Sequence, residues 1–339
     1  MAKKFQNITE NTLITPMDTL NWTDDLVYDK VDTGFCQFTV EDANYFPCKK
    51  TVVNIPSGFY RIRKDFQRGI FFAQQGIITN KLVTLESCEI HKDIMEDISK
   101  FWSSKEEYRK RGRAYKRNIL IHSVPGMGKT SLINLVVKDL ISNHNGFVLS
   151  ISDNNDIFNF VEAMSYIRSA MPERPVIAII EDIDNFAGEN AQNRELETEL
   201  LNILDGIQQY DNIVILATTN YPETLTERYI NRPSRFNRSI EYPYPSADVR
   251  REFIVKTNLE EDIAKIDLVK WVKKTDGFTT DHLKELCDSV FLYGYTEDKA
   301  FETIQKMKDT KILKNKSGSE KKKVGFKIKK NSCNENESI

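Results

Sequence analysis

The sequence predicts an α/β fold in which a mostly parallel sheet lies between two layers of helices. Uninterrupted apolar runs recur along the middle of the chain, as at 119–121, 175–180 and 212–217. Such runs are typical of strands that are buried on both faces. Segments with apolar residues at helical spacing lie between them, as at 130–137 and 195–207. Strands that alternate with helices in this way favour a parallel sheet.

One stretch, residues 116–131, has the pattern of a phosphate-binding loop. An apolar run precedes a turn rich in Pro and Gly, and a helical pattern begins at Thr130. Gly126 and Gly128 allow the backbone to curl so that successive N–H groups point inward, to the place where the positive end of the following helix also points. Ser123 stands where the motif G-x-x-x-x-G-K-[ST] has its first Gly, so the match departs at one position.

The loop also carries the two side chains that a bound nucleotide requires. Lys129 is expected to reach the outer phosphates, and the Thr130 hydroxyl is expected to bind Mg²⁺. An ordinary Gly-containing turn between a strand and a helix is the alternative. The residues that we expect to bind the nucleotide are Ser123, Pro125, Gly126, Met127, Gly128, Lys129, Thr130 and Ser131.

Two acidic residues, Glu181 and Asp182, directly follow the apolar run 175–180. Carboxylates at the carboxyl end of a strand in an open α/β sheet lie where ligands bind. Beside a nucleotide, one carboxylate can hold Mg²⁺ while the other orients or deprotonates the attacking water. A charged turn that only caps the strand is the alternative.

Polar and basic side chains follow the next predicted strand. That strand ends at Asn220, whose side chain we expect to hold the γ-phosphate or the attacking water. Farther along, Arg232, Arg235 and Arg238 lie in one turn. Arginines can stabilise the charge of a phosphoryl transition state, from the same chain or from a neighbour. Surface salt bridges are their alternative use.

The two ends of the chain differ from this middle region. Residues 1–87 contain β-branched and aromatic stretches separated by turn signals, which predicts a small β-rich domain. A helix is predicted from about residue 87 to 110. Residues 314–339 are rich in Lys, Ser and Asn and show little apolar periodicity, which predicts a basic, disordered tail. A contact of its lysines with nucleic acid or an acidic partner is the alternative to a solvated tail.

Composition limits the class of protein. The chain has 339 residues and a formal net charge of −2, so no global field attracts nucleic acid or membranes. It has no apolar run near the roughly 20 residues that span a bilayer and no signal sequence at its start. The five cysteines are scattered, which indicates neither a disulfide framework nor a zinc site. We therefore expect a cytoplasmic protein.

Five motifs in this order resemble those of the AAA ATPase family. They are Ser-Val-Pro-Gly-Met-Gly-Lys-Thr at 123–130, Ile-Ile-Glu-Asp-Ile-Asp at 179–184, Leu-Leu-Asn-Ile-Leu-Asp-Gly at 200–206, Ala-Thr-Thr-Asn at 217–220 and Arg-Pro-Ser-Arg-Phe-Asn-Arg at 232–238. Residues 276–283 also resemble the helical-lid signature of the family. The resemblance covers about 88–300 and implies a three-layer P-loop domain at 88–245, followed by a helical lid at 246–313.

The resemblance also implies a ligand for the loop and a role for the acids. ATP is the expected nucleotide, with Lys129 as its phosphate contact. Thr130 and Glu181 are then the Mg²⁺ ligands, and Asp182 serves the attacking water. Asn220 corresponds to the first sensor of the family.

Members of the family bind ATP at subunit interfaces and assemble into rings, commonly hexamers. The resemblance therefore makes Arg235 and Arg238 arginine fingers that enter the site of the next subunit. It predicts a homo-oligomeric ring, commonly a hexamer, with a protein client that the sequence does not identify.

The order Glu181-Asp182 reverses the usual Asp-Glu of the family. It is similar to the mitochondrial subgroup that translocates a folded Rieske iron–sulfur protein, and the basic run at 108–117 resembles that subgroup too. The compact, Lys-, Asn- and Ile-rich chain also suits a phage-encoded relative that works in a host cytoplasm. The segment 151–158, where unfolding motors carry a gripping aromatic, is short and polar.

These features lead to three hypotheses about function. The first is Mg²⁺-dependent ATP hydrolysis in a ring that remodels or translocates a protein client, in the manner of a chaperone. The second is a loader or remodeller that acts on nucleic acid or a nucleoprotein complex through the basic tail. The third is a nucleotide-gated scaffold that has lost hydrolysis through its Glu181-Asp182 order.

Overall fold

The structure is a computed structural model that consists of two units, residues 1–53 and 54–339, each of which is described by itself. It describes residues 37–41, 44–48, 54–67, 69–76, 82–187, 191–205, 211–225, 227–230 and 232–316. In the first unit, β1 (Gln37–Glu41) and β2 (Asn44–Cys48) pair as an antiparallel hairpin.

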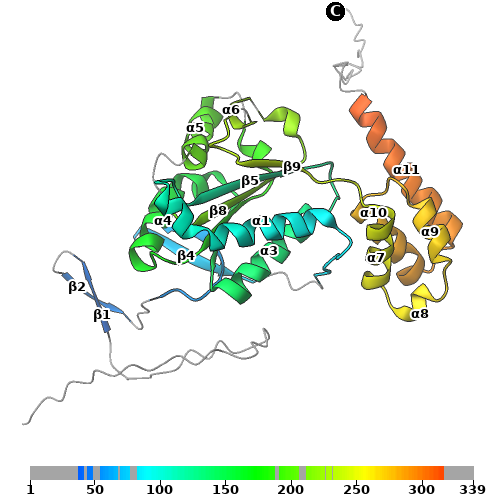
Figure 1. Ribbon diagram of the computed structural model, residues 1–339, viewed down its shortest axis with the longest axis horizontal. Coiled ribbons are helices and arrows are strands. Elements are labelled where there is room, and N and C mark those ends of the chain that lie inside the picture. The colour runs from blue at the N-terminus through cyan, green and yellow to red at the C-terminus, as the bar shows by residue number, and fades with distance from the viewer. Residues whose placement is uncertain are drawn as a thin grey trace, which may run out of the picture. The chain divides into compact units, whose positions relative to one another are not determined.

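A seven-stranded sheet forms the centre of the second unit (Figure 1). Its order is β4-β3-β6-β7-β8-β5-β9, and every neighbouring pair is parallel except β3 and β4. The strands are β3 (Gly58–Asp65), β4 (Gly69–Gln75), β5 (Lys116–His122), β6 (Phe147–Ile151), β7 (Val176–Ile180), β8 (Ile213–Thr219) and β9 (Arg238–Glu241).

The strands at 58–65 and 69–75 correct the predicted domain boundary at residue 87. We expected them in a separate β-rich domain, but Gly58–Arg61 pairs in parallel with Phe147–Ser150 of β6. Buried Tyr60 also stacks on Phe147, with ring centroids 4.4 Å apart. The hairpin therefore extends the central sheet and belongs to the unit of residues 54–339.

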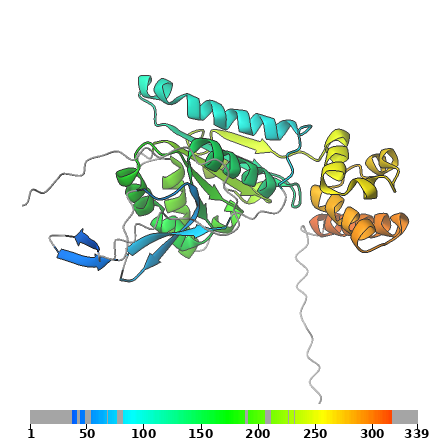
Figure 2. The ribbon, with the colours of Figure 1, turned by 90° about the horizontal axis from the view of Figure 1, so that it is seen from below.

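Helices cover both faces of the sheet (Figure 2). They are α1 (Glu89–Ser103), α2 (Lys105–Lys110), α3 (Lys129–His144), α4 (Asn154–Ala170), α5 (Ala191–Asp205) and α6 (Glu227–Ile230). Strand residues alternate between two cores, so that Leu149 packs with α4 and α5 while its neighbour Val148 packs with α1 and α3. This alternation produces the three layers that the uninterrupted apolar strands predict.

A second group of helices, coloured yellow to orange in Figure 1, has its own core. It comprises α7 (Ala247–Thr257), α8 (Glu260–Ile263), α9 (Leu268–Lys274), α10 (Thr280–Cys287) and α11 (Glu297–Lys316). Trp271 is fully buried at its centre and stacks on Phe291, at 5.6 Å between ring centroids. We call these helices the lid.

The predicted fold class, an α/β sheet domain followed by helices, is confirmed. The predicted helix at 87–110 is present but breaks at Ser104 into α1 and α2. Residues 317–339, nearly all of the predicted tail, lie outside the described residues. No helix in the described part of the chain has the length and apolarity that crossing a membrane requires.

Candidate active site

The predicted site residues gather at one edge of the sheet because parallel strands end on the same side. The phosphate loop follows β5, Glu181 and Asp182 follow β7, and Asn220 follows β8. Because β8 lies between β7 and β5, Asn220 lies between the loop and the acids. This edge is where open α/β sheets bind ligands.

The two glycines of the loop adopt backbone angles that other residues rarely adopt. Gly126 has φ of +81° and Gly128 has φ of +101°, both in the left-handed region. Between them the Met127 side chain is buried and anchors the loop. Ser123 is also buried, whereas Pro125 is exposed. The curled backbone is the one that a phosphate-binding loop requires.

Lys129 is buried beneath the loop and is held by polar groups. Its Nζ donates to the Ser123 hydroxyl at 2.8 Å and to the side-chain Oδ1 of Asn220 at 2.7 Å. Burial lowers the pKa of Lys129, while the negative charges of Asp182, Asp184 and Asp281 act in the opposite direction. Ser123, at the position of the missing Gly, thus serves as an acceptor for the lysine.

Asn220 connects Lys129 to the acidic pair. Its amide nitrogen donates to the Asp182 carboxylate at 2.9 Å, while its amide oxygen accepts from Lys129. Asp182 has a left-handed backbone with φ of +49°, and its N–H donates to the Thr218 hydroxyl at 3.2 Å. The structure therefore brings three predicted site residues into one hydrogen-bonded row.

Asp184 is a site residue that we noted in the sequence but assigned no role. Its carboxylate accepts a 2.6 Å hydrogen bond from Thr219, which directly precedes Asn220. The Thr219 hydroxyl in turn accepts the N–H of Tyr221, at 2.9 Å. Asp184 therefore fixes the backbone on both sides of Asn220. In the sequence, the only indication of this role was that Asp184 is the third acid in the run Glu181-Asp182-Ile183-Asp184.

Thr130, Ser131 and Glu181 are exposed at the same edge. The structure shows no hydrogen bond from the side chains of Thr130 and Glu181 to other described residues. Glu181 lines a hollow of about 640 Å³ together with Ser152, Asp153, Asn154, Asn155, Asp182, Asn185 and Phe186. The Thr130 hydroxyl and the Glu181 carboxylate are thus accessible to a ligand.

Arg235 is buried and paired within its own chain. Three hydrogen bonds of 2.8 to 3.0 Å join its Nε and Nη2 to the Asp205 carboxylate at the end of α5. The Arg235 carbonyl also accepts from the buried Asn118 side chain on β5. This arginine anchors the turn in which it lies.

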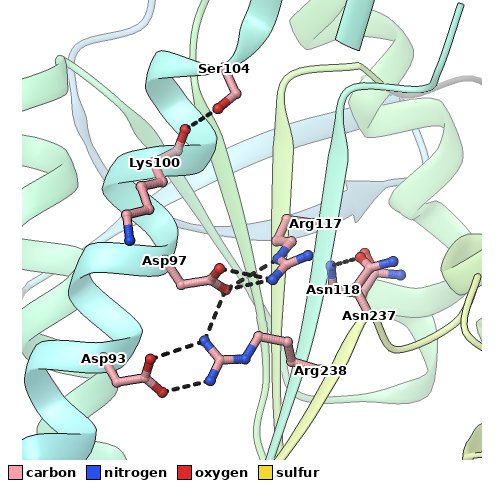
Figure 3. A network of polar contacts seen from close by, with 8 residues as sticks. All are labelled: Asp93, Asp97, Lys100, Ser104, Arg117, Asn118, Asn237 and Arg238. Atoms are coloured by element: carbon pink, nitrogen blue, oxygen red, sulfur yellow. Dashed lines mark hydrogen bonds and ion pairs between the residues drawn. The ribbon is translucent and has the colours of Figure 1, made fainter. Parts of the chain in front are cut away.

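Arg238 is partly exposed and contacts two acids of α1 (Figure 3). Its Nη2 lies 2.6 Å from Asp93, and its Nη1 lies 3.5 Å from Asp97. Asp97 also pairs with Arg117 of β5 at 2.8 Å. The ion pairs with Asp93 and Asp97 raise the pKa of Arg238. The two acids thus hold Arg238 against α1.

The strand register places both arginines away from the phosphate loop of the same chain. Arg238 is paired with Ile119 and Glu241 with His122, the residue before the loop begins at Ser123. Arg238 therefore lies three strand positions, about 10 Å, before the edge from which the loop leaves. The structure brings the loop, the acids and Asn220 together but leaves Arg235 and Arg238 outside that group.

The matched family model decides what this group of residues is. Residues 119–244, from β5 through β9, match the model described as ATPase family associated with various cellular activities (AAA). Within the chain, residues 119–244 are thus similar to an AAA ATPase domain. This domain implies ATP hydrolysis, and AAA proteins are generally oligomeric.

Curated relatives agree with this assignment. A putative cell division cycle ATPase of Plasmodium falciparum is 26% identical over 63% of the chain and 18% of its own length. The ATP-dependent zinc metalloprotease FtsH of Marinobacter nauticus is 26% identical over 65% of the chain and 36% of its own length. A proteasome-activating nucleotidase of Methanococcus vannielii is 26% identical over 69% of the chain and 60% of its own length. The chain thus spans less than two thirds of the length of each of these relatives.

Proposed function

We propose that this chain hydrolyses ATP as part of a homo-oligomeric ring, commonly a hexamer, and that hydrolysis remodels or translocates a protein client. The observation that carries the ring is the position of Arg235 and Arg238. They lie at the amino end of β9, whereas the phosphate loop lies at the carboxyl end of β5. Arginines at the amino end of β9 are placed to reach the nucleotide of a neighbouring subunit rather than that of their own chain.

The hydrogen-bonded row at the sheet edge supports a direct mechanism. The γ-phosphate would take the place of Asn220 as a partner of Lys129, which leaves Asn220 and Asp182 beside the attacking water. Asp182 accepts a proton from that water while the water oxygen bonds to the γ-phosphorus. The bond between the γ-phosphorus and the leaving oxygen of ADP breaks in the same step. The products are ADP and phosphate, and an arginine from the neighbour stabilises the charge that develops.

The donor set also fits Mg²⁺. Thr130 offers an exposed hydroxyl and Glu181 an exposed carboxylate that the structure leaves without hydrogen bonds to described residues. Mg²⁺ in nucleotide sites is usually held by one or two such groups together with phosphate oxygens. When bound, it would neutralise phosphate charge, and Thr130 and Glu181 would hold it.

A protein client is favoured by the relatives, which include a metalloprotease and a proteasome-activating nucleotidase. The connection between β6 and α4 consists of Ser152 and Asp153 alone. It is too short to extend an aromatic finger, although Phe158 of α4 is exposed. This short loop and the Glu181-Asp182 order support the resemblance to the subgroup that moves a folded protein.

A mixing experiment tests the ring. Arg238→Ala removes the arginine but leaves the phosphate loop, and Lys129→Met removes the loop lysine but leaves the arginines. Each variant alone is expected to be inactive. Mixed subunits would place an intact loop next to an intact arginine at some interfaces, so ATPase activity should reappear.

Arg117→Ala mixed with Lys129→Met is the matched control, because Arg117 also pairs with Asp97 but lies on β5. Arg117→Ala alone should keep its activity and gain none from mixing. A wild-type rate per subunit that does not depend on protein concentration, with full activity in Arg238→Ala, would reject the ring. ATP binding without hydrolysis in the wild type would favour a nucleotide-gated scaffold.

A further inference from the structure

The lid directly contacts the phosphate loop through the first residues of α10. The Thr280 hydroxyl and the Asp281 N–H both donate to the Gly126 carbonyl, at 2.9 and 3.0 Å. A Cβ on Gly126 would lie 2.9 Å from the Asp281 carboxylate, and a Cβ on Gly128 would lie 3.3 Å from the Thr280 hydroxyl. The loop glycines thus leave the space that the lid occupies.

This contact brings a carboxylate to the place where a polyanion binds. Asp281 is exposed, and the structure records no ion pair between it and another described residue. Its negative charge acts on Lys129 together with those of Asp182 and Asp184. Three carboxylates therefore act against the effect of burial on the Lys129 ammonium group, and Asp281 is the one that belongs to the lid.

We propose that Asp281 is a positioning residue that makes the attachment of the lid depend on the phosphate charge held by the loop. Each phosphate added beside Gly126 repels the Asp281 carboxylate and weakens the two hydrogen bonds that hold α10. Loss of phosphate after hydrolysis lets the contact form again.

Thermodynamic linkage makes the effect reciprocal. If phosphate charge weakens the lid contact, then the lid contact, through its Asp281 carboxylate, must weaken phosphate binding by the same factor. Removing its charge should therefore tighten the binding of nucleotides in proportion to their number of phosphates. This inference rests on nucleotide binding at the loop and does not depend on the ring.

The test compares wild type with Asp281→Asn, which keeps the size and the backbone hydrogen bond but removes the charge. Calorimetric titration measures Kd for ATP, ADP and AMP, and displacement of ADP measures Kd for inorganic tripolyphosphate. We expect Asp281→Asn to bind ATP and tripolyphosphate about threefold to tenfold more tightly, ADP less so and AMP almost unchanged. The gain should vanish at about 1 M salt, where charges are screened beyond roughly 3 Å.

Two variants serve as controls. Thr280→Val removes the other hydrogen bond to Gly126 without changing charge, so its effect should be the same for all nucleotides. Asp298→Asn removes an exposed charge from α11, elsewhere on the lid, and should change no affinity. Hydrogen exchange at residues 281–283 gives an independent measurement. A non-hydrolysable ATP analogue should increase exchange relative to ADP in wild type but not in Asp281→Asn.

The outcomes are distinct. Tripolyphosphate affinity that does not change, together with a change for ATP, would mean that Asp281 contacts the ribose, and it would overturn the proposal. Equal weakening of all nucleotides in Asp281→Asn would mean a purely structural contact and would overturn it as well. A wild-type protein that binds no nucleotide would reject this inference together with the proposed function.

Discussion

Arg235 and Asp205 form a closed ion pair inside one chain, with three hydrogen bonds of 2.8 to 3.0 Å. Arg235 is 7% exposed, and its bonds to Asp205 lower the pKa of that carboxyl group. An arginine that acts on a neighbouring site must first leave this partner. Asp205 thus stabilises the turn, and in the proposed ring it would also compete with the neighbouring subunit for the guanidinium group.

Asp205→Ala is expected to destabilise the protein. The substitution leaves the buried Arg235 guanidinium without its counter-charge, which typically costs about 3 kcal/mol or more. Urea unfolding followed by circular dichroism measures this loss. Arg232→Ala is the control, because Arg232 is exposed and lies 3.9 Å from the same carboxylate. It should change the free energy of unfolding by less than about 0.5 kcal/mol. Equal losses in both variants would contradict a specific role for the Arg235 pair.

This pair shows what the sequence could not reveal about the arginines. Arg235 and Asp205 are 30 residues apart, and the motif that predicts a role for Arg235 contains no information about its resting partner. The same holds for Arg238, whose acids lie on α1, 145 residues earlier than Arg238 in the case of Asp93. The motif identified the residue types, whereas their pairing depends on how β9 and α5 fold against β5.

Lys129→Met is expected to abolish tight nucleotide binding without harming the fold. The ammonium group is buried and contacts neutral oxygens, so its replacement by an apolar chain of similar length removes a desolvated charge. We expect ATP affinity to fall about 100-fold or more, with a midpoint of thermal unfolding that is unchanged or higher. Calorimetric titration and thermal unfolding measure the two quantities. Lys138→Met, at an exposed position of the same helix, should leave ATP affinity unchanged. A marked loss of stability in Lys129→Met would contradict this account.

Asn220→Ala should separate binding from chemistry. The side chain joins Lys129 to Asp182, so its loss misplaces the groups around the attacking water while the loop itself stays intact. We expect kcat to fall about 100-fold and ATP affinity to change little. Steady-state ATPase assays and calorimetric titration distinguish the two effects. Asn143→Ala, on the exposed surface of α3, is the matched control. A large loss of ATP affinity in Asn220→Ala would instead make Asn220 part of the binding loop.

Local patterns predicted which residues would lie together at this edge, because each of them follows the end of a strand. The loop, the acids and Asn220 each follow an apolar strand, and parallel strands place those ends on one edge. The hairpin at 58–75 was misassigned because its short aromatic strands look the same in a small separate domain and at the edge of a larger sheet. The pairing of β3 with β6 decides between them, and its residues, such as Tyr60 and Leu149, are 89 positions apart in the sequence.

A carboxylate on the lid also holds the segment before α1. Glu252 of α7 accepts the backbone N–H groups of Glu86 and Ser87 at 2.7 and 2.8 Å, and Lys256 lies 2.6 Å away. Lys256 in turn donates to the Thr84 carbonyl at 3.0 Å. Burial acts to raise the pKa of Glu252, but the hydrogen bonds from Lys256 and Ser87 outweigh it and lower the pKa to about 2. Two charged side chains of the lid, Glu252 and Lys256, therefore hold the segment 84–87 that precedes α1.

Glu252→Gln is expected to destabilise the protein at neutral pH and to have little effect in acid. A carboxylate whose pKa is lowered on folding contributes stability above its ordinary pKa of 4.5, and this contribution is lost as pH falls toward about 2. We expect a loss of about 2 kcal/mol near pH 7 that shrinks steadily below about pH 4.5. Thermal unfolding of both proteins across this range measures it. Glu261→Gln, at an exposed position of α8, should track wild type at every pH. A difference between wild type and Glu252→Gln that persists unchanged in acid would mean that shape, rather than charge, fastens the lid.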